Sequence, residues 1–168
     1  MVEKEEQALN RAADFINNSE KPSQSARKQL LDKWKKFVTD NKLAFSVDGD
    51  VYLRVEAWNY LFSMNKLSAT VTDISRIPND EGKTLYIAKA ALMPMSTQLS
   101  EDGVPLGVTA FGACEVGEND YCKDEFAALS MAQTRAIGKL GRTAYAHLAI
   151  ACGYKATPLE EMSTKERK

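Results

Sequence analysis

The spacing of hydrophobic residues divides the chain into helical and extended stretches. Apolar side chains that recur every three or four positions predict a helix, and short apolar or alternating runs between turn residues predict a strand. The predicted elements are, in chain order, helices over 2–17 and 24–39, strands over 43–47 and 51–54, a helix over 55–65, strands over 68–77, 83–93 and 105–116, and a long helix from Asp124 to about Cys152.

Turn and capping residues separate these stretches. Asp48-Gly49 is typical of a tight hairpin turn, and the run 78–82 (PNDEG) predicts a turn between two strands. Asp124 is a suitable N-cap for the last helix, and Gly153 a suitable C-terminal stop. Within the helix over 55–65, the side chains expected to point inward are Trp58, Leu61 and Phe62.

Hairpin-linked strands followed by a long helix predict an α+β fold. We expect an antiparallel β-sheet, built from a β-hairpin and a β-β-β meander, with the long C-terminal helix packed on one face and two N-terminal helices. The expected organisation is an N-terminal helical segment over 1–42, a β-β-β-α core over 43–154 and a polar tail over 155–168.

The last helix has two different sides when its residues are placed at about 100° per residue. The apolar side is expected to face the sheet, and the opposite side carries Arg135, Lys139 and Arg142 among alanines. The expected sheet-facing residues are Phe126, Leu129, Gln133, Ile137, Leu140, Ala144, Leu148 and Ala151.

Charge is segregated around this helix. No Asp or Glu lies between Phe126 and Pro158, so the usual i,i+4 ion pairs within a helix are absent, and acidic residues crowd just upstream. The cations either form a solvated helix face or reach a polyanion such as a phosphate backbone. Gly138 and Gly141 each cost roughly 1 kcal/mol against Ala in a helix. Their compensation is a close contact, either within the chain or with a neighbouring subunit.

Composition narrows the classes of function. The 168 residues are about one domain's worth, and 22 Lys plus Arg against 23 Asp plus Glu give a net charge of −1. Any nucleic-acid binding must therefore use a local patch. No stretch approaches the roughly 20 apolar residues of a membrane span, and the start of the chain is too charged for a signal peptide. Three cysteines without CxxC spacing favour a reducing compartment, so we expect a cytoplasmic protein.

Other constellations predict little chemistry. The single histidine, His147, excludes His-pair catalysis and His-rich metal sites, and no glycine-rich phosphate loop precedes a helix. Asp80-Glu-Gly-Lys83 is superficially similar to a nuclease motif but follows Pro78-Asn79, which indicates a turn. We therefore expect no enzyme, cofactor or metal. Tyr86 and Phe111 lie on predicted strands, and burial is expected for both.

Two motifs carry a resemblance. Two segments, and the three strands predicted between them, resemble the single-strand annealing proteins. The segments are Tyr52-Leu-Arg-Val-Glu-Ala-Trp58 and Leu129-Ser-Met-Ala-Gln-Thr-Arg-Ala-Ile-Gly-Lys-Leu-Gly-Arg142. A third segment, Gly153-Tyr-Lys-Ala-Thr-Pro-Leu-Glu-Glu-Met162, is also similar to these proteins. That superfamily includes phage recombination proteins of the Erf, Sak and Redβ kinds and the eukaryotic annealing protein of double-strand-break repair. Lys139 and Arg142 look like two of its basic positions, and Gly138 stands where a third would be.

The resemblance implies ATP-independent binding and annealing of single-stranded DNA in recombination and repair, by a ring or filament of identical subunits. A single-strand-binding protein or a nuclease is a possible further partner. The expected phosphate contacts are Arg135, Lys139 and Arg142, with weaker candidates around the sheet at Arg54, Lys66, Lys83 and Lys89. The alternative is a protein-interaction module in which the basic helix face docks on acidic partners and DNA plays no part.

Overall fold

The structure, a computed structural model, describes residues 24–78, 82–95 and 107–161. The chain divides into two compact units between Leu30 and Leu31, and both sheets and the long C-terminal helix belong to the unit that begins at Leu31. The helix expected over 2–17 lies outside the described residues, as do the first two residues of the strand expected over 105–116.

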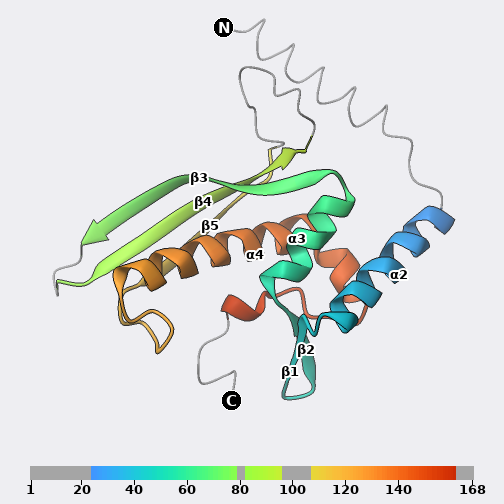
Figure 1. Ribbon diagram of the computed structural model, residues 1–168, viewed down its shortest axis with the longest axis horizontal. Coiled ribbons are helices and arrows are strands. Elements are labelled where there is room, and N and C mark those ends of the chain that lie inside the picture. Colours follow the sequence, from blue (N-terminus) through green and yellow to red (C-terminus); the bar gives the residue numbers. More distant parts are fainter. Residues whose placement is uncertain (1–23, 79–81, 96–106, 162–168) are drawn as a thin grey trace, which may run out of the picture. The chain divides into compact units, whose positions relative to one another are not determined.

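The fold is α+β, as the hydrophobic spacing predicts (Figure 1). The strand that was expected from 105 begins only at Thr109. The elements are, in chain order, α2 (Gln24–Asp40), β1 (Ala44–Val47), β2 (Asp50–Leu53), α3 (Val55–Met64), β3 (Leu67–Pro78), β4 (Thr84–Pro94), β5 (Thr109–Glu115), α4 (Glu125–Ala151) and the short 3₁₀ helix η1 (Leu159–Glu161).

The strands form two separate antiparallel sheets. β1 and β2 pair as a hairpin whose two turn residues, Asp48 and Gly49, both have positive φ (51° and 86°), which is the backbone of a type I′ turn. β3, β4 and β5 form a three-stranded meander with the order β3-β4-β5 and an irregular register between Val71 and Asp73. The antiparallel hairpin and meander expected from the sequence are confirmed.

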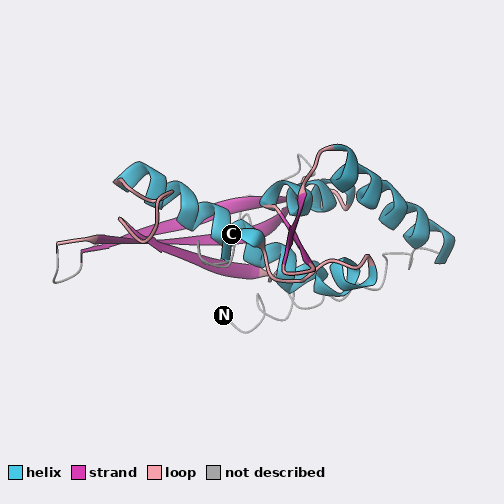
Figure 2. Ribbon diagram, turned by 90° about the horizontal axis from the view of Figure 1, so that it is seen from below, coloured by secondary structure: helices cyan, strands magenta, loops and turns pink. Residues whose placement is uncertain are grey.

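α4 packs along one face of the meander (Figures 1 and 2), but not with the predicted side. Its sheet-facing residues are alanines, because Ala128, Ala132 and Ala136 are fully buried while Phe126 is 79% exposed. Gly112 of β5 allows this close approach, since a Cβ there would lie 2.2 Å from the backbone of both Ala132 and Ala136. The expectation that the bulky apolar stripe faces the sheet is therefore wrong.

α4 is also covered on the side away from the sheet. A Cβ on Gly141 would lie 2.4 Å from the Trp58 ring of α3, and one on Gly138 would lie 2.9 Å from Pro158. Gly141 is nine residues beyond Ala132, which at about 100° per residue places it on the opposite side of the helix. Both glycines thus serve close packing within the chain, the first of the two explanations left open by the sequence.

The core beside α4 is aromatic. Trp58, Leu61 and Phe62 of α3 are fully buried, as predicted, together with Trp34 of α2. The indole N–H of Trp34 donates to the backbone carbonyl of Ala57 at 2.9 Å, and its ring lies 6.0 Å from that of Trp58. This cluster joins the described part of α2 from Leu31 onward to α3.

The ends of α4 are defined by the predicted residues, but its path is not straight. Asp124 is the N-cap, and its carboxylate accepts a hydrogen bond from the Ala127 N–H at 2.8 Å. Gly153 follows the C-cap with a φ of 86°. Tyr145 departs from helical geometry (φ −134°, ψ 19°) and bends the helix near its end. The hydrophobic pattern gives no sign of this bend.

The segment that follows α4 packs against the rest of the unit. The Lys155 N–H donates to the Val51 carbonyl at 2.7 Å, and Pro158 is fully buried. Leu159 of η1 is buried beside Val47 of the hairpin. Residues 155–161, expected to belong to a polar tail, thus lie on the hairpin and on α4, and residues 162–168 lie outside the described part of the chain.

Candidate nucleic-acid interface

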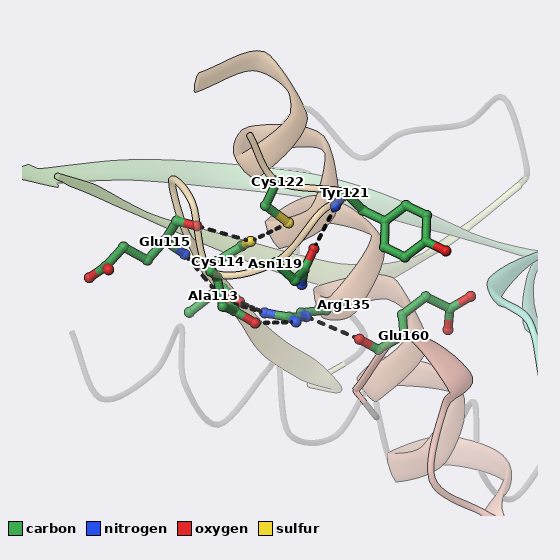
Figure 3. Close-up of polar contacts among 9 residues, drawn as sticks. Ala113, Cys114, Glu115, Asn119, Tyr121, Cys122, Arg135 and Glu160 are labelled. Atoms are coloured by element: carbon green, nitrogen blue, oxygen red, sulfur yellow. Dashed lines mark hydrogen bonds and ion pairs between the residues drawn. The ribbon is translucent and has the colours of Figure 1, made fainter. Parts of the chain in front are cut away.

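The guanidinium group of Arg135 lies against β5 and is held by polar contacts within the chain (Figure 3). It forms a two-point ion pair with the Glu118 carboxylate, at 2.6 and 3.0 Å. It also donates to the backbone carbonyls of Ala113 at 2.7 Å and Glu160 at 3.1 Å. Because only 12% of its side chain is exposed, Arg135 is committed to internal contacts.

Arg135 therefore does not project to the side away from the sheet, and that expectation is corrected. Its acidic partner comes from the loop between β5 and α4, so the absence of acids within the helix did not reveal it. The hydrogen bond from Arg135 is the main reason that the pKa of the Glu118 carboxyl lies below its usual value. The same hydrogen bond raises the pKa of Arg135.

The other two cations of the row differ from each other. Arg142 is partly exposed and lies 3.3 Å from the Glu161 carboxylate of η1. Lys139 is partly buried and makes no ion pair or hydrogen bond with any residue that the structure describes. The row of α4 is thus partly neutralised by the segment that follows the helix, and it is not the continuous cationic ridge that the sequence predicts.

Three of the weaker candidates lie far from one another. Arg54 is exposed at the N-cap of α3, and Lys66 is exposed just after the end of that helix. Lys83 immediately precedes β4, and its ammonium lies 3.7 Å from the Glu115 carboxylate. The backbone carbonyl of Lys66 accepts from the N–H of Met95, just past the other end of β4. At about 3.3 Å per residue, Lys66 and Lys83 are separated by roughly 35–40 Å along the sheet.

The fourth candidate, Lys89, lies on the face of the sheet that is turned away from α4. It pairs in register with Phe111 of β5, and its ammonium nitrogen lies 5.9 Å from the centre of that ring. Phe111 is 55% exposed, so the expected burial of this side chain is wrong. Tyr86, three residues before Lys89, points to the α4 side and is buried as expected.

We call this surface the open face. On the described strands it carries the side chains that alternate with the α4-facing ones, and its exposed members surround the Lys89–Phe111 pair. They are Thr70, Asp73, Ser75 and Ile77 of β3 and Thr109 and Ala113 of β5. Two carboxylates share the face, because Asp73 pairs in register with Lys89 and Glu115 pairs with Leu85. The open face is therefore mixed in charge, with an exposed aromatic ring and a lysine at its centre.

The described His and Cys side chains form no cluster of metal-binding size, although Cys114 and Cys122 lie side by side. His147 is exposed on α4, and Cys114, Cys122 and Cys152 are free thiols. Within residues 24–78, 82–95 and 107–161, no three His, Cys, Asp or Glu side chains lie close enough to bind a metal ion together. Asp80 and Glu81 of the nuclease-like sequence lie outside the described residues.

Comparisons with protein-family models, with curated proteins and with solved structures find no match to this chain. None of the helices in the described ranges is both long enough and apolar enough to cross a bilayer.

Proposed function

We propose that this protein binds single-stranded DNA on the open face of the β3-β4-β5 sheet and anneals complementary strands without ATP. The observation that carries the proposal is the Lys89–Phe111 pair, an exposed ring with an ammonium group 5.9 Å from its centre. Bases stack on exposed aromatic rings regardless of sequence, and a neighbouring cation binds the phosphate that follows the stacked base.

We place the DNA on the open face and not on the α4 cations because two of those cations already have acidic partners within the chain. Arg135 is enclosed and Arg142 is paired, so binding a phosphate there requires breaking existing ion pairs. Lys89 has no ion pair with any described residue, and its Thr72 contact uses only the backbone carbonyl. Lys139, Arg54 and Lys66 remain candidates for secondary phosphate contacts. A chain with a net charge of −1 is expected to bind weakly as a monomer.

Weak binding by one subunit suits a multimer. Several copies side by side bind one strand at many points, and their affinities combine through effective concentration. Assembly into a ring or filament, a cytoplasmic location and cooperation with a single-strand-binding protein or a nuclease belong to this proposal through the family resemblance given above.

Fluorescence anisotropy with labelled oligonucleotides tests the surface. Phe111→Ala removes a stack worth about 1–3 kcal/mol per base, so we expect roughly 5- to 150-fold weaker binding to single strands. Lys89→Ala is expected to lower the slope of log affinity against log salt by about 0.7, the value for one phosphate on a single strand. Annealing of complementary strands, followed by quenching of paired dyes, should slow in both variants.

Matched controls separate a specific surface from a general loss of charge or hydrophobicity. Phe126→Ala removes a ring that is even more exposed than Phe111, from the first turn of α4, and Lys36→Ala removes an exposed lysine from α2. Both should bind and anneal as the wild type does. Wild-type binding by Phe111→Ala and Lys89→Ala would exclude the open face.

The alternative function, a protein-interaction module, is favoured by one observation. Ile77 and Phe111 are 45% and 55% exposed on the same face, and exposed apolar side chains also serve protein contacts. The two functions differ in their dependence on salt, because binding to a phosphate backbone weakens steeply as salt rises and apolar docking does not. A wild-type chain that binds no single-stranded DNA even at low salt would favour the protein-interaction module.

A further inference from the structure

Two buried thiols face each other at the end of β5. The sulfur of Cys114, the next-to-last residue of β5, lies 2.9 Å from that of Cys122, which lies in the loop before α4 (Figure 3). Both side chains are almost completely buried, and both thiols are free. A disulfide has a sulfur–sulfur length of about 2.05 Å, so the two sulfurs need to approach by less than about 1 Å to bond.

The loop between these cysteines is held in place by its own backbone. The Gly117 N–H donates to the Cys122 carbonyl at 2.6 Å, and the Cys122 N–H donates to the Asn119 carbonyl at 3.0 Å. These bonds keep the two ends of the loop together in the reduced protein. The two sulfurs can therefore reach each other without refolding of the loop.

The same loop covers the outer edge of β5. Glu118 accepts a hydrogen bond from the Glu115 N–H at 3.3 Å, while its partner Arg135 donates to the Ala113 carbonyl at 2.7 Å. Together the two side chains satisfy a donor and an acceptor that a neighbouring strand would otherwise use. We call this arrangement the edge clamp. It blocks β-pairing at this point of the strand, in the manner by which proteins protect sheet edges.

We propose that Cys114 and Cys122 form a reversible disulfide when the protein meets a peroxide, and that this disulfide locks the edge clamp. One thiol gives up its proton, and the thiolate attacks a peroxide oxygen and breaks the O–O bond; this gives a sulfenic acid and a hydroxide that takes up the released proton as water. The sulfur of the second thiol then attacks the sulfenic sulfur, and the S–S bond forms as the S–OH bond breaks and the hydroxyl leaves with the thiol proton as a second water. With hydrogen peroxide the balance is two thiols and one H₂O₂ giving one disulfide and two H₂O. Hydrogen peroxide is the oxidant and the two sulfurs lose two electrons in total.

Burial controls the rate of this step. Burial away from water is the main reason that the pKa of the Cys114 thiol is raised, and the hydrogen bond with Cys122 is the second. The thiol therefore stays protonated, and a protonated thiol is a poor nucleophile. Oxidation therefore requires local opening of the loop that admits the small peroxide molecule. We expect a slow reaction that dithiothreitol reverses.

Peptide mapping of the full-length chain tests the bond directly. Cys152→Ser serves as the working background, because it leaves only the two proposed partners. After treatment with hydrogen peroxide and blocking of the remaining thiols, cleavage after Glu115 or Glu118 separates Cys114 from Cys122. The two resulting peptides should stay joined until dithiothreitol is added. Closing so short a loop should also raise Tm by roughly 5–10 °C.

The proposal is independent of DNA binding, and its failure would look different from that of the proposed function. Peptides that separate without reductant, or thiols that end as sulfinic acid, would overturn it, and so would a disulfide that leaves Tm unchanged. Cys122→Ala should lose the rise in Tm on oxidation. If that variant does not fold, peptide mapping of the Cys152→Ser protein still decides the question.

Discussion

Arg135 is held by an ion pair and by hydrogen bonds to two backbone carbonyls of its own chain. Its charge and its place in the motif drew attention to it, but its guanidinium satisfies the edge of β5 and a turn of η1. A cation that is 12% exposed and bonded on several sides supports the fold. Replacing it removes the partner of a partly buried carboxylate, which costs more than the pair itself contributes. Loss of DNA binding in an Arg135 variant therefore requires a stability measurement before it is assigned to DNA.

The ion pair makes stability sensitive to acid. Because Arg135 lowers the pKa of Glu118 in the folded protein, Glu118 adds stability that is fully present above its unfolded pKa of about 4.3. That contribution is lost as the pH falls through the lower folded pKa. We expect Tm of the wild type to fall more between pH 6 and pH 3 than Tm of Glu118→Gln, measured by circular dichroism. The two proteins should differ most at pH 6, with Glu118→Gln the less stable. Parallel curves would contradict a role for this carboxylate.

At the scale of the elements, the sequence predicted which segments are helices and strands but not how α4 is turned. The Asp48-Gly49 turn, the Asp124 cap and the Gly153 stop are local signals, and all three lie where expected. Helix orientation depends on what surrounds the helix. A helix wheel assumes one buried side and places the largest apolar residues there, whereas α4 packs against the sheet on one side and against Trp58 on the other. Small residues mark both contacts because they allow close approach.

The site was harder to predict than the fold for a related reason. Lys89 was among the candidates, but its ring partner Phe111 was expected to be buried, since an aromatic residue on a strand usually belongs to the core. The register that places the two side chains together on the open face is set by long-range pairing of β4 and β5. Gly112 is the residue that could have indicated this arrangement. Successive side chains of a strand point to opposite faces of the sheet, so if Gly112 lies against α4, its neighbour Phe111 lies on the other face.

The contact between Gly141 and Trp58 provides a test of how closely α3 and α4 pack. Gly141→Ala should destabilise the protein by about 1–3 kcal/mol, because a methyl group there overlaps the fully buried indole ring. The gain in helix propensity, roughly 1 kcal/mol, only partly offsets this cost. Urea unfolding followed by tryptophan fluorescence measures the difference. Thr143→Ala, an exposed position two residues later, is the control and should change stability by less than about 0.5 kcal/mol. A Gly141→Ala protein at least as stable as the wild type would mean that α3 and α4 are farther apart.

At the scale of the whole unit, acidic residues pair with four of the cations around the sheet and α4. Arg76 pairs with Glu125, Lys83 with Glu115, Arg135 with Glu118 and Arg142 with Glu161, so a near-zero net charge does not leave a basic surface unopposed. Three of these four acids, Glu115, Glu118 and Glu125, lie between the end of β5 and the first turn of α4. This is the acidic stretch that lies just upstream of the last helix in the sequence. That stretch is a set of partners for cations on β3, on α4 and just before β4. The open face remains the described surface where a lysine and an exposed ring meet.

The short segment around η1 joins three parts of the unit that are distant in sequence. Leu159 is buried against the hairpin residue Val47, the Glu160 carboxylate accepts from the Val55 N–H of α3 at 3.0 Å, and Glu161 pairs with Arg142 of α4. A perturbation here should therefore loosen the hairpin, α3 and α4 together. The composition of this segment predicts a polar tail, whereas the buried side chains of Pro158 and Leu159 fasten it to the rest of the unit.

Leu159→Ala tests this cohesion. Truncating a buried leucine to alanine removes apolar contacts and leaves a cavity, so we expect a loss of about 2–3 kcal/mol, near the lower end of such substitutions because the site lies close to the surface. Urea unfolding should be followed both by tryptophan fluorescence, which reports on Trp34 and Trp58, and by far-ultraviolet circular dichroism. If η1 holds the unit together, both signals should shift to lower urea by the same amount, because the hairpin, α3 and α4 unfold as one. Phe45→Ala, at a 40% exposed position on the same hairpin, should have a much smaller effect. A shift confined to one signal would show that the hairpin and η1 unfold separately from the helical core.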